Sequence, residues 1–80
     1  MWVRPSEDDV KLIARCGTTE APVFVDDLRA WALREAWTRS KFYRKLAKSR
    51  RYGWIKQEGS VAYRTDRGER LLKAWRVRGK

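Results

Sequence analysis

The sequence predicts one small α+β domain in which helices predominate. Its 80 residues suffice for a single domain, and 42% of them are hydrophobic, which is enough for a compact core. Apolar residues recur at helical spacing in four segments, and two short β-prone runs flank a glycine near the middle of the second half. We expect the domain to span residues 1–80, with its core at about residues 6–75.

The first helix is predicted to begin after Ser6. The Ser6 hydroxyl can accept a hydrogen bond from a first-turn amide, and the acids at residues 7–9 suit the positive end of the helix dipole. Its apolar positions follow at helical spacing: Val10, Ile13, Ala14 and Cys16. Gly17 is a suitable C-terminal stop, and Cys16 is expected to be a small buried hydrophobe.

A second helix is expected after residues 23–25, which form a short β-prone run. Asp26 is predicted to cap this helix. Its apolar stripe consists of Leu28, Trp31, Ala32 and Ala36.

A third helix is predicted to start at Thr38 or Ser40, either of which can cap it, and to run to about Arg51. Its buried stripe lies within roughly 60° on a helical wheel. This stripe consists of Phe42, Leu46 and Ser49. Residues 52–53 are expected to end the helix, since glycine tolerates the conformation that follows a helix C-terminus.

The remaining chain predicts a hairpin and a fourth helix. Residues 54–57 and 61–64 are the strand candidates, and either Glu58-Gly59 or Gly59-Ser60 can form the tight turn. Thr65 is predicted to cap the last helix. The inner face of that helix consists of Gly68, Leu71, Leu72 and Trp75. We expect residues 76–80 to fray.

Composition excludes several classes of protein. The chain has no histidine, which excludes histidine-dependent catalysis, and its one cysteine cannot staple the fold. A zinc site would have almost no ligands. We therefore expect neither an enzyme nor a bound cofactor or metal. No run of about 20 apolar residues and no export leader occurs, so we expect a cytoplasmic protein without membrane contact. The absence of asparagine and the single glutamine fit a thermophilic source, and a GC-rich genome would produce much of the same pattern.

The net charge of +10 is unevenly distributed. Residues 1–35 hold five basic residues and seven acids, whereas residues 36–80 hold fifteen basic residues and three acids. The densest stretch, residues 38–51, holds seven basic residues and no acid. Clustered positive charge of this kind indicates a polyanionic partner.

The order of elements resembles the winged helix-turn-helix family, particularly small regulators of archaea, bacteria and their viruses. The segments that carry the resemblance are Val25 with Leu28, residues 38–46, residues 52–55 and residues 63–68. The last of these is similar to the family's recurrent Tyr-Leu-Thr-x-x-Gly, which leads from the wing to the final helix. The resemblance implies a three-helix core, a short β-hairpin wing and a C-terminal helix.

It further implies a sequence-selective double-stranded DNA-binding protein, a nucleoid-associated transcriptional regulator with residues 39–51 in the major groove. Side chains expected to reach base edges or phosphates are Ser40, Lys41, Arg44 and Lys48. Thr38 and Arg39 suit phosphate at the helix start, and Tyr43 can donate to a phosphate or contact a thymine methyl. Those expected to hold the flanking backbone are Lys45, Arg50, Arg51, Lys56 and Arg64.

Two other functions fit the same sequence. A basic helix also suits structured RNA or the ribosome, and some winged helices are protein–protein adaptors that bind no nucleic acid. Self-association as a homodimer is a further expectation, through an apolar stripe of the first and last helices. This stripe consists of Val10, Ile13, Leu71, Leu72 and Trp75. No small-molecule partner is indicated.

Overall fold

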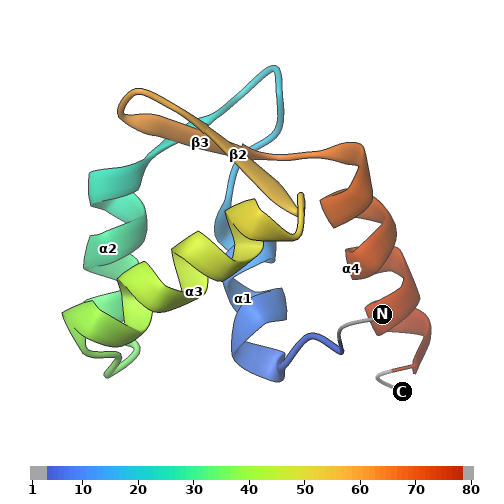
Figure 1. Ribbon diagram of the computed structural model, residues 1–80, viewed down its shortest axis with the longest axis horizontal. Coiled ribbons are helices and arrows are strands. Elements are labelled where there is room, and N and C mark those ends of the chain that lie inside the picture. Colours follow the sequence, from blue (N-terminus) through green and yellow to red (C-terminus); the bar gives the residue numbers. More distant parts are fainter. Residues whose placement is uncertain (1–3, 79–80) are drawn as a thin grey trace.

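The computed structural model describes residues 4–78 and consists of four helices and a small antiparallel sheet (Figure 1). The elements in chain order are α1 Glu7–Arg15, β1 Val23–Phe24, α2 Val25–Arg34, α3 Arg39–Arg51, β2 Ile55–Glu58, β3 Val61–Arg64 and α4 Asp66–Arg78. The predicted α+β class with mainly helical content is confirmed. None of the helices within residues 4–78 is long and apolar enough to span a membrane.

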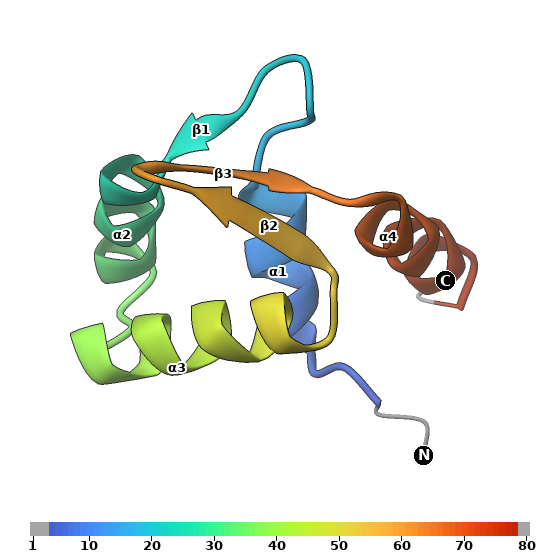
Figure 2. The same ribbon diagram turned by 45° about the horizontal axis from the view of Figure 1, so that its top comes forward.

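The sheet has the strand order β1-β3-β2, so its central strand is the last of the three in the sequence. It lies at one end of the helices, with α3 crossing in front of α1 and with α4 on the side away from α2 (Figures 1 and 2). In the hairpin Glu58 pairs with Val61, which leaves Gly59 and Ser60 as the turn. Gly59 has a φ of +61°, as a two-residue hairpin turn requires.

Helix α1 begins as predicted, with a capping box. The Asp9 N–H donates to Ser6 Oγ at 3.2 Å, and the Ser6 N–H donates to Asp9 Oδ2 at 2.8 Å. The buried side consists of Asp9, Val10, Leu12, Ile13 and Cys16. Ala14, predicted to belong to it, is exposed, and Leu12 takes its place in the core. Gly17 follows the C-cap. Only glycine fits at this position, because a Cβ there would lie 1.9 Å from the Ala21 carbonyl oxygen.

Two predictions for α2 are wrong. Asp26 is not the N-cap: Phe24 holds that position, two residues earlier, and no side chain caps the helix. Ala36 is not part of the helical stripe, because α2 ends at Arg34. Ala36 adopts a φ of +66°, while its N–H donates to Leu33 O and the Trp37 N–H donates to Ala32 O. These bonds form a Schellman motif, which reverses the chain so that Trp37 enters the core.

Helix α3 and the segment after it follow the prediction closely. The Lys41 N–H donates to Thr38 Oγ1 at 3.0 Å, which makes Thr38 the N-cap and leaves Ser40 exposed inside the helix. Its buried residues are Phe42, Leu46 and Ser49. Gly53 ends the run with a φ of +74°, and the chain then enters β2.

Helix α4 starts at the predicted cap, where the Gly68 N–H donates to Thr65 Oγ1 at 3.1 Å. Gly68 and Leu72 are buried, and Leu71 and Trp75 pack against the core while remaining partly exposed. Residues 76–78, for which fraying was expected, continue the helix. Residues 79–80, for which fraying was also expected, lie outside the described residues.

Cys16 is buried, as predicted, and its thiol should be inert in the folded protein. Burial raises the pKa of Cys16 to about 12, although the Arg64 charge acts in the opposite direction. At pH 8 a disulfide reagent should therefore label native Cys16 more than about a thousandfold more slowly than the same thiol in denaturant. Rapid labelling of the folded chain would contradict this assignment.

Candidate nucleic-acid interface on helix α3

Helix α3 has a buried stripe, a side that faces α1 and an outer side. The buried stripe fixes the helix against the core, and the seven basic residues are divided among the remaining positions. Three lysines lie on the α1 side: Lys41, Lys45 and Lys48. The outer side consists of Ser40, Arg44, Ala47 and Arg51, which lie within about 60° of one another on the wheel.

The three lysines are paired with acids of α1. Lys41 Nζ lies 2.7 Å from Asp8 Oδ2, and Lys48 Nζ lies 2.7 Å from Asp9 Oδ2. Lys45 Nζ lies 3.3 Å from Asp9 Oδ1 and also donates to Ser6 Oγ at 3.1 Å. These ammonium groups therefore tie α3 to α1, and the two carboxylates offset two of their three positive charges.

Asp9 is the centre of this cluster, with none of its side chain exposed to solvent. Burial raises the pKa of Asp9, but the hydrogen bonds from Lys48 and from the Ser6 N–H, together with the Lys45 charge, outweigh it. The pKa consequently lies below its ordinary value of 3.8. The sequence indicated only a helix-capping role for Asp9, since its lysine partners lie up to 39 residues away. The one available signal was the helical spacing of the three lysines.

The cations on the outer side of α3, unlike the three lysines, have no acidic partner among the described residues. Within residues 4–78, no carboxylate lies within ion-pair distance of Arg44 or Arg51. Both side chains are exposed, and Ala47 lies between them as a small residue. A shallow hollow of about 320 Å³ follows this side of the helix. It is lined by Arg44, Ala47, Lys48, Arg51 and Tyr52. An anion can therefore approach the α3 backbone closely here and meet two unpaired guanidinium groups.

The α2 side of α3 carries Arg39 and Tyr43, both exposed. Tyr43 is 45% exposed, and its hydroxyl accepts a hydrogen bond from Arg29 Nη1 of α2 at 2.9 Å. Arg29 Nη2 also lies 3.4 Å from Asp26 Oδ1. The predicted contact residues at the start of α3 thus border on α2, which the sequence had not indicated as part of the surface.

The hairpin positions differ in what their cations contact. Arg64 Nη1 donates to the carbonyl oxygens of Ala14 and Cys16, and its Nε contacts Glu69, so Arg64 joins β3 to α1 and α4. Arg50 Nη1 donates to Gln57 Oε1 at 3.0 Å and joins α3 to β2. Lys56 is exposed, with its Nζ 3.9 Å from Glu58 Oε2. Of these cations, Lys56 is the one most accessible to a partner.

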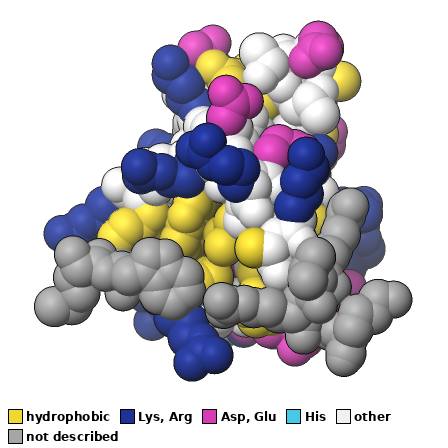
Figure 3. Space-filling view, turned by 90° about the vertical axis from the view of Figure 1, so that its right-hand side faces the viewer, with side chains coloured by type: hydrophobic (Ala, Val, Ile, Leu, Met, Phe, Trp, Pro, Cys, Tyr) yellow, Lys and Arg dark blue, Asp and Glu magenta, His cyan; other side chains and the backbone are white. Residues whose placement is uncertain are grey.

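The stripe predicted for self-association is mostly used inside the chain. Ile13 and Leu72 are buried, as is Val10, which leaves Leu71 and Trp75 partly exposed. Figure 3 looks at the side of the molecule on which α4 lies and shows basic side chains around an exposed apolar area. The basic residues of α4 include Arg70 and Lys73, both exposed.

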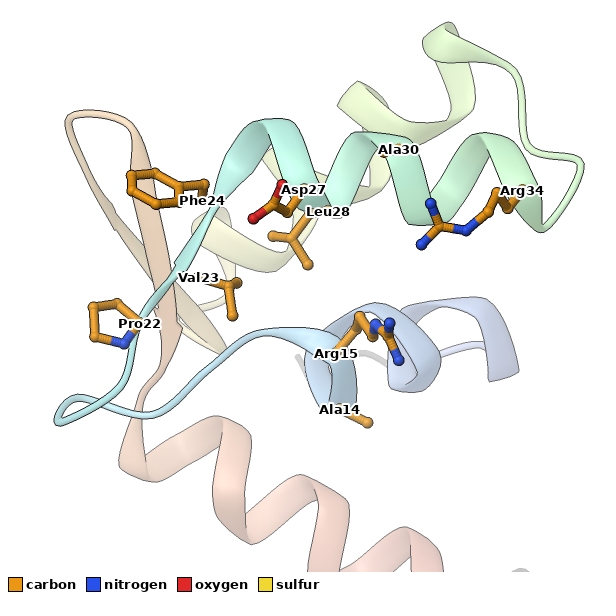
Figure 4. Close-up of a pocket in the computed structure, with 9 residues that line it drawn as sticks. All are labelled: Ala14, Arg15, Pro22, Val23, Phe24, Asp27, Leu28, Ala30 and Arg34. Carbon is orange, nitrogen blue, oxygen red and sulfur yellow. The ribbon is translucent and has the colours of Figure 1, made fainter.

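A second hollow lies between α1 and α2, with a volume of about 650 Å³. Arg15 and Arg34 reach into it from the two helices, and Asp27 lies near the start of α2 (Figure 4). Arg15 is also 6.0 Å from the centre of the Trp31 ring. In the described part of the chain, no group of histidine, cysteine and acidic residues is arranged to hold a metal ion.

Comparisons of the chain with protein-family models, with curated proteins and with solved structures found no match. Evidence for a function therefore comes from α3 and the residues around it.

Proposed function

We propose that the protein binds double-stranded DNA in a sequence-selective manner and acts as a transcriptional regulator of the winged helix-turn-helix type. The observation that carries the proposal is the outer side of α3, where Arg44 and Arg51 are exposed and unpaired around Ala47. An α-helix with side chains is about 10–12 Å across, and the major groove of B-DNA is about 12 Å wide. The outer side of α3 has the dimensions and charge to enter that groove.

The arrangement of the neighbouring elements supports this type of fold. Helices α2 and α3 are joined by a tight turn, and a two-stranded hairpin follows α3 directly. With β1 added to the hairpin, the sheet lies at one end of the helices (Figure 2). The residues of the outer side of α3 remain exposed. In the proposed complex the β2–β3 hairpin lies beside the DNA backbone and offers Lys56 to it.

The proposal assigns separate roles to the basic residues of α3. Arg44 and Arg51 contact base edges or phosphates, and Ser40 reaches a base edge nearby. Arg39, at the N-terminal end of α3, contacts a phosphate, where the helix dipole adds to its charge. The three lysines that pair with Asp8 and Asp9 hold α3 in place and contribute little direct contact.

This division has a measurable consequence in the salt dependence of binding. If only the unpaired arginines and Lys56 neutralise phosphates, the log–log salt slope should lie near about −3 to −4. Full participation of the three lysines would move the slope to about −6.

The decisive variant combines Arg44→Ala with Arg51→Ala. We expect its affinity for duplex DNA to fall about 10–100-fold, and the salt slope to fall in magnitude by about 2, because two charged contacts are lost. Fluorescence anisotropy with a labelled duplex across a salt series measures both quantities. The matched control, Arg70→Ala with Lys73→Ala, removes the same charge from α4 and should bind within about threefold of the unaltered protein.

Duplex binding that stays within twofold after the Arg44 and Arg51 changes would exclude α3 as the DNA-contacting element. The same titration with single strands and with structured RNA tests the alternative partner. Tighter binding of structured RNA than of duplex DNA at equal salt would replace the DNA assignment with an RNA one.

A further inference from the structure

We propose that Arg29 and Tyr43 together form a phosphate clamp that joins α2 to α3 at the edge of the DNA interface. This inference rests on the proposed DNA-binding function and extends the interface to a helix that charge density alone did not indicate. The bound group is a phosphate diester of the duplex backbone.

The clamp is a cross-helix contact between residues 14 positions apart in the chain. Arg29 Nη1 donates to Tyr43 Oη at 2.9 Å, and Arg29 Nη2 pairs with Asp26 at 3.4 Å. The Tyr43 ring is packed edge-on against the buried Phe42 ring, with 5.1 Å between the ring centres. The Phe42 contact thus positions the ring and the Arg29 bond positions the hydroxyl, while the residue remains 45% exposed.

The direction of the hydrogen bond determines what the pair can bind. A guanidinium group has only donors, so Tyr43 must accept in this contact and keeps its own proton to donate elsewhere. Among residues 4–78, the Tyr43 hydroxyl donates no hydrogen bond of its own. Tyr63 shows the opposite arrangement, because its hydroxyl donates to Glu58 Oε2 at 3.0 Å within the hairpin.

Both members of the pair therefore offer donors to an external acceptor. Arg29 has five N–H donors, and the contacts with Tyr43 and Asp26 leave others free. A phosphate diester presents two unesterified oxygens, one for the Tyr43 hydroxyl and one for the guanidinium. The Arg29 charge polarises the tyrosine hydroxyl and strengthens its bond to an anion.

The position of the pair favours backbone over bases. Tyr43 lies about 100° around α3 from Arg44, so it faces sideways when the outer side points into the groove. The sides of the major groove are formed by phosphates, and contacts to them set the register without reading sequence. The clamp should therefore fix the rotation of α3 in the groove and act equally on every sequence.

The test uses Tyr43→Phe and Arg29→Met in the full chain, each with a matched control. Tyr43→Phe removes only the hydroxyl, and Tyr63→Phe makes the same change where the hydroxyl is satisfied internally. Arg34→Met is the control for Arg29→Met, because Arg34 leaves the same helix about 140° away and reaches into the α1–α2 hollow (Figure 4). Binding is measured by anisotropy on two duplexes of unrelated sequence across a salt series, and thermal unfolding is recorded for each variant.

We expect Tyr43→Phe to weaken binding about 3–10-fold on both duplexes with an unchanged salt slope, since a neutral donor is lost. Arg29→Met should weaken binding at least as much and reduce the magnitude of the salt slope by about 1. The double variant should lose less than the product of the two single losses, because the members act as one unit. Both controls should bind within twofold of the unaltered protein.

Wild-type affinity in Tyr43→Phe or Arg29→Met would overturn the clamp, as would equal losses in the controls. A loss confined to one of the two duplexes would also overturn it, because Tyr43 would then read a base. If these variants bind normally while the Arg44 and Arg51 variant is weakened, the clamp fails and the proposed function stands. If the unaltered chain does not bind duplex DNA at low salt, the proposed function itself fails.

Discussion

Replacing Asp9 with alanine is expected to lower the free energy of unfolding by about 3–5 kcal/mol, the usual cost of removing one partner from a buried ion pair. The change leaves Lys45 and Lys48 without their counter-ion and also removes one half of the capping box. A domain of this size has a total free energy of unfolding of about 4–12 kcal/mol, so this change would remove a large part of it. The melting temperature should fall by about 15–30 °C, which thermal denaturation followed by circular dichroism measures.

Two further variants separate the contributions to this loss. Asp9→Asn keeps a side-chain oxygen that can accept from the Ser6 N–H but removes the charge, so it isolates the lysine pairs from the cap. Asp8→Asn breaks the Lys41 pair, which is about one-third exposed on both sides and should cost no more than about 1 kcal/mol. If Asp9→Asn and Asp8→Asn destabilise the domain equally, the buried cluster does not hold α3 in place.

The same cluster predicts the response of stability to acid. The pKa of Asp9 is lowered in the folded state, so its contribution to stability is fully present above the unfolded pKa of 3.8 and is lost as pH falls through the folded value. Unfolding free energy measured by urea titration from pH 6 to pH 2 should therefore decline more steeply below pH 4 in the unaltered protein than in Asp9→Asn. Parallel curves for the two proteins would contradict the assignment.

Gly68→Ala is expected to destabilise the domain by about 3 kcal/mol, the upper part of the range for forced overpacking. An added Cβ would lie 2.2 Å from the Trp54 carbonyl oxygen and 3.4 Å from Ile13 Cγ2. Intrinsic helix propensity predicts the opposite sign, since alanine is favoured over glycine inside a helix by about 1 kcal/mol. The direction of the change therefore decides between local propensity and packing, and urea denaturation measures it.

Gly59→Ala serves as the matched control. Gly59 has open space around its Cα but a φ of +61°, so alanine should cost about 1 kcal/mol through backbone strain alone. A stabilised Gly68→Ala variant would show that α4 does not pack against the Trp54 backbone as described.

Features that depend on neighbouring residues could be predicted from the sequence. The caps at Ser6, Thr38 and Thr65 each involve an amide three residues away, and the stripe of α3 follows from the helical repeat. The hairpin could be placed, but its turn could not, because Glu58-Gly59 and Gly59-Ser60 are locally equivalent. Pairing of Glu58 with Val61 decides between them.

The missed features depend on contacts between distant segments. Asp26 has the chemistry of a cap, yet the start of α2 is set by β1 and by the Val25 N–H, which donates to Ser60 O at 2.8 Å. Gly17 and Gly68 are required because other backbone segments approach them, which a local pattern does not reveal. The same holds for the candidate site. The residues of the outer side of α3 follow from the helical repeat, whereas the pairing of the α3 lysines with Asp8 and Asp9 requires knowledge of where α1 lies.

The central place of α1 has a consequence for the synthesis of the protein. Helix α1 precedes the other elements of the domain in the chain, but its packing partners are α3 and α4. Asp9 on its buried side pairs with Lys48, which lies 39 residues further along the chain, and Ile13 packs near Gly68, which lies further still. The apolar residues of α1 therefore lack part of their packing partners until α4 has emerged. We expect the core to form in one late, cooperative step rather than helix by helix, at a rate set by closure of that long loop.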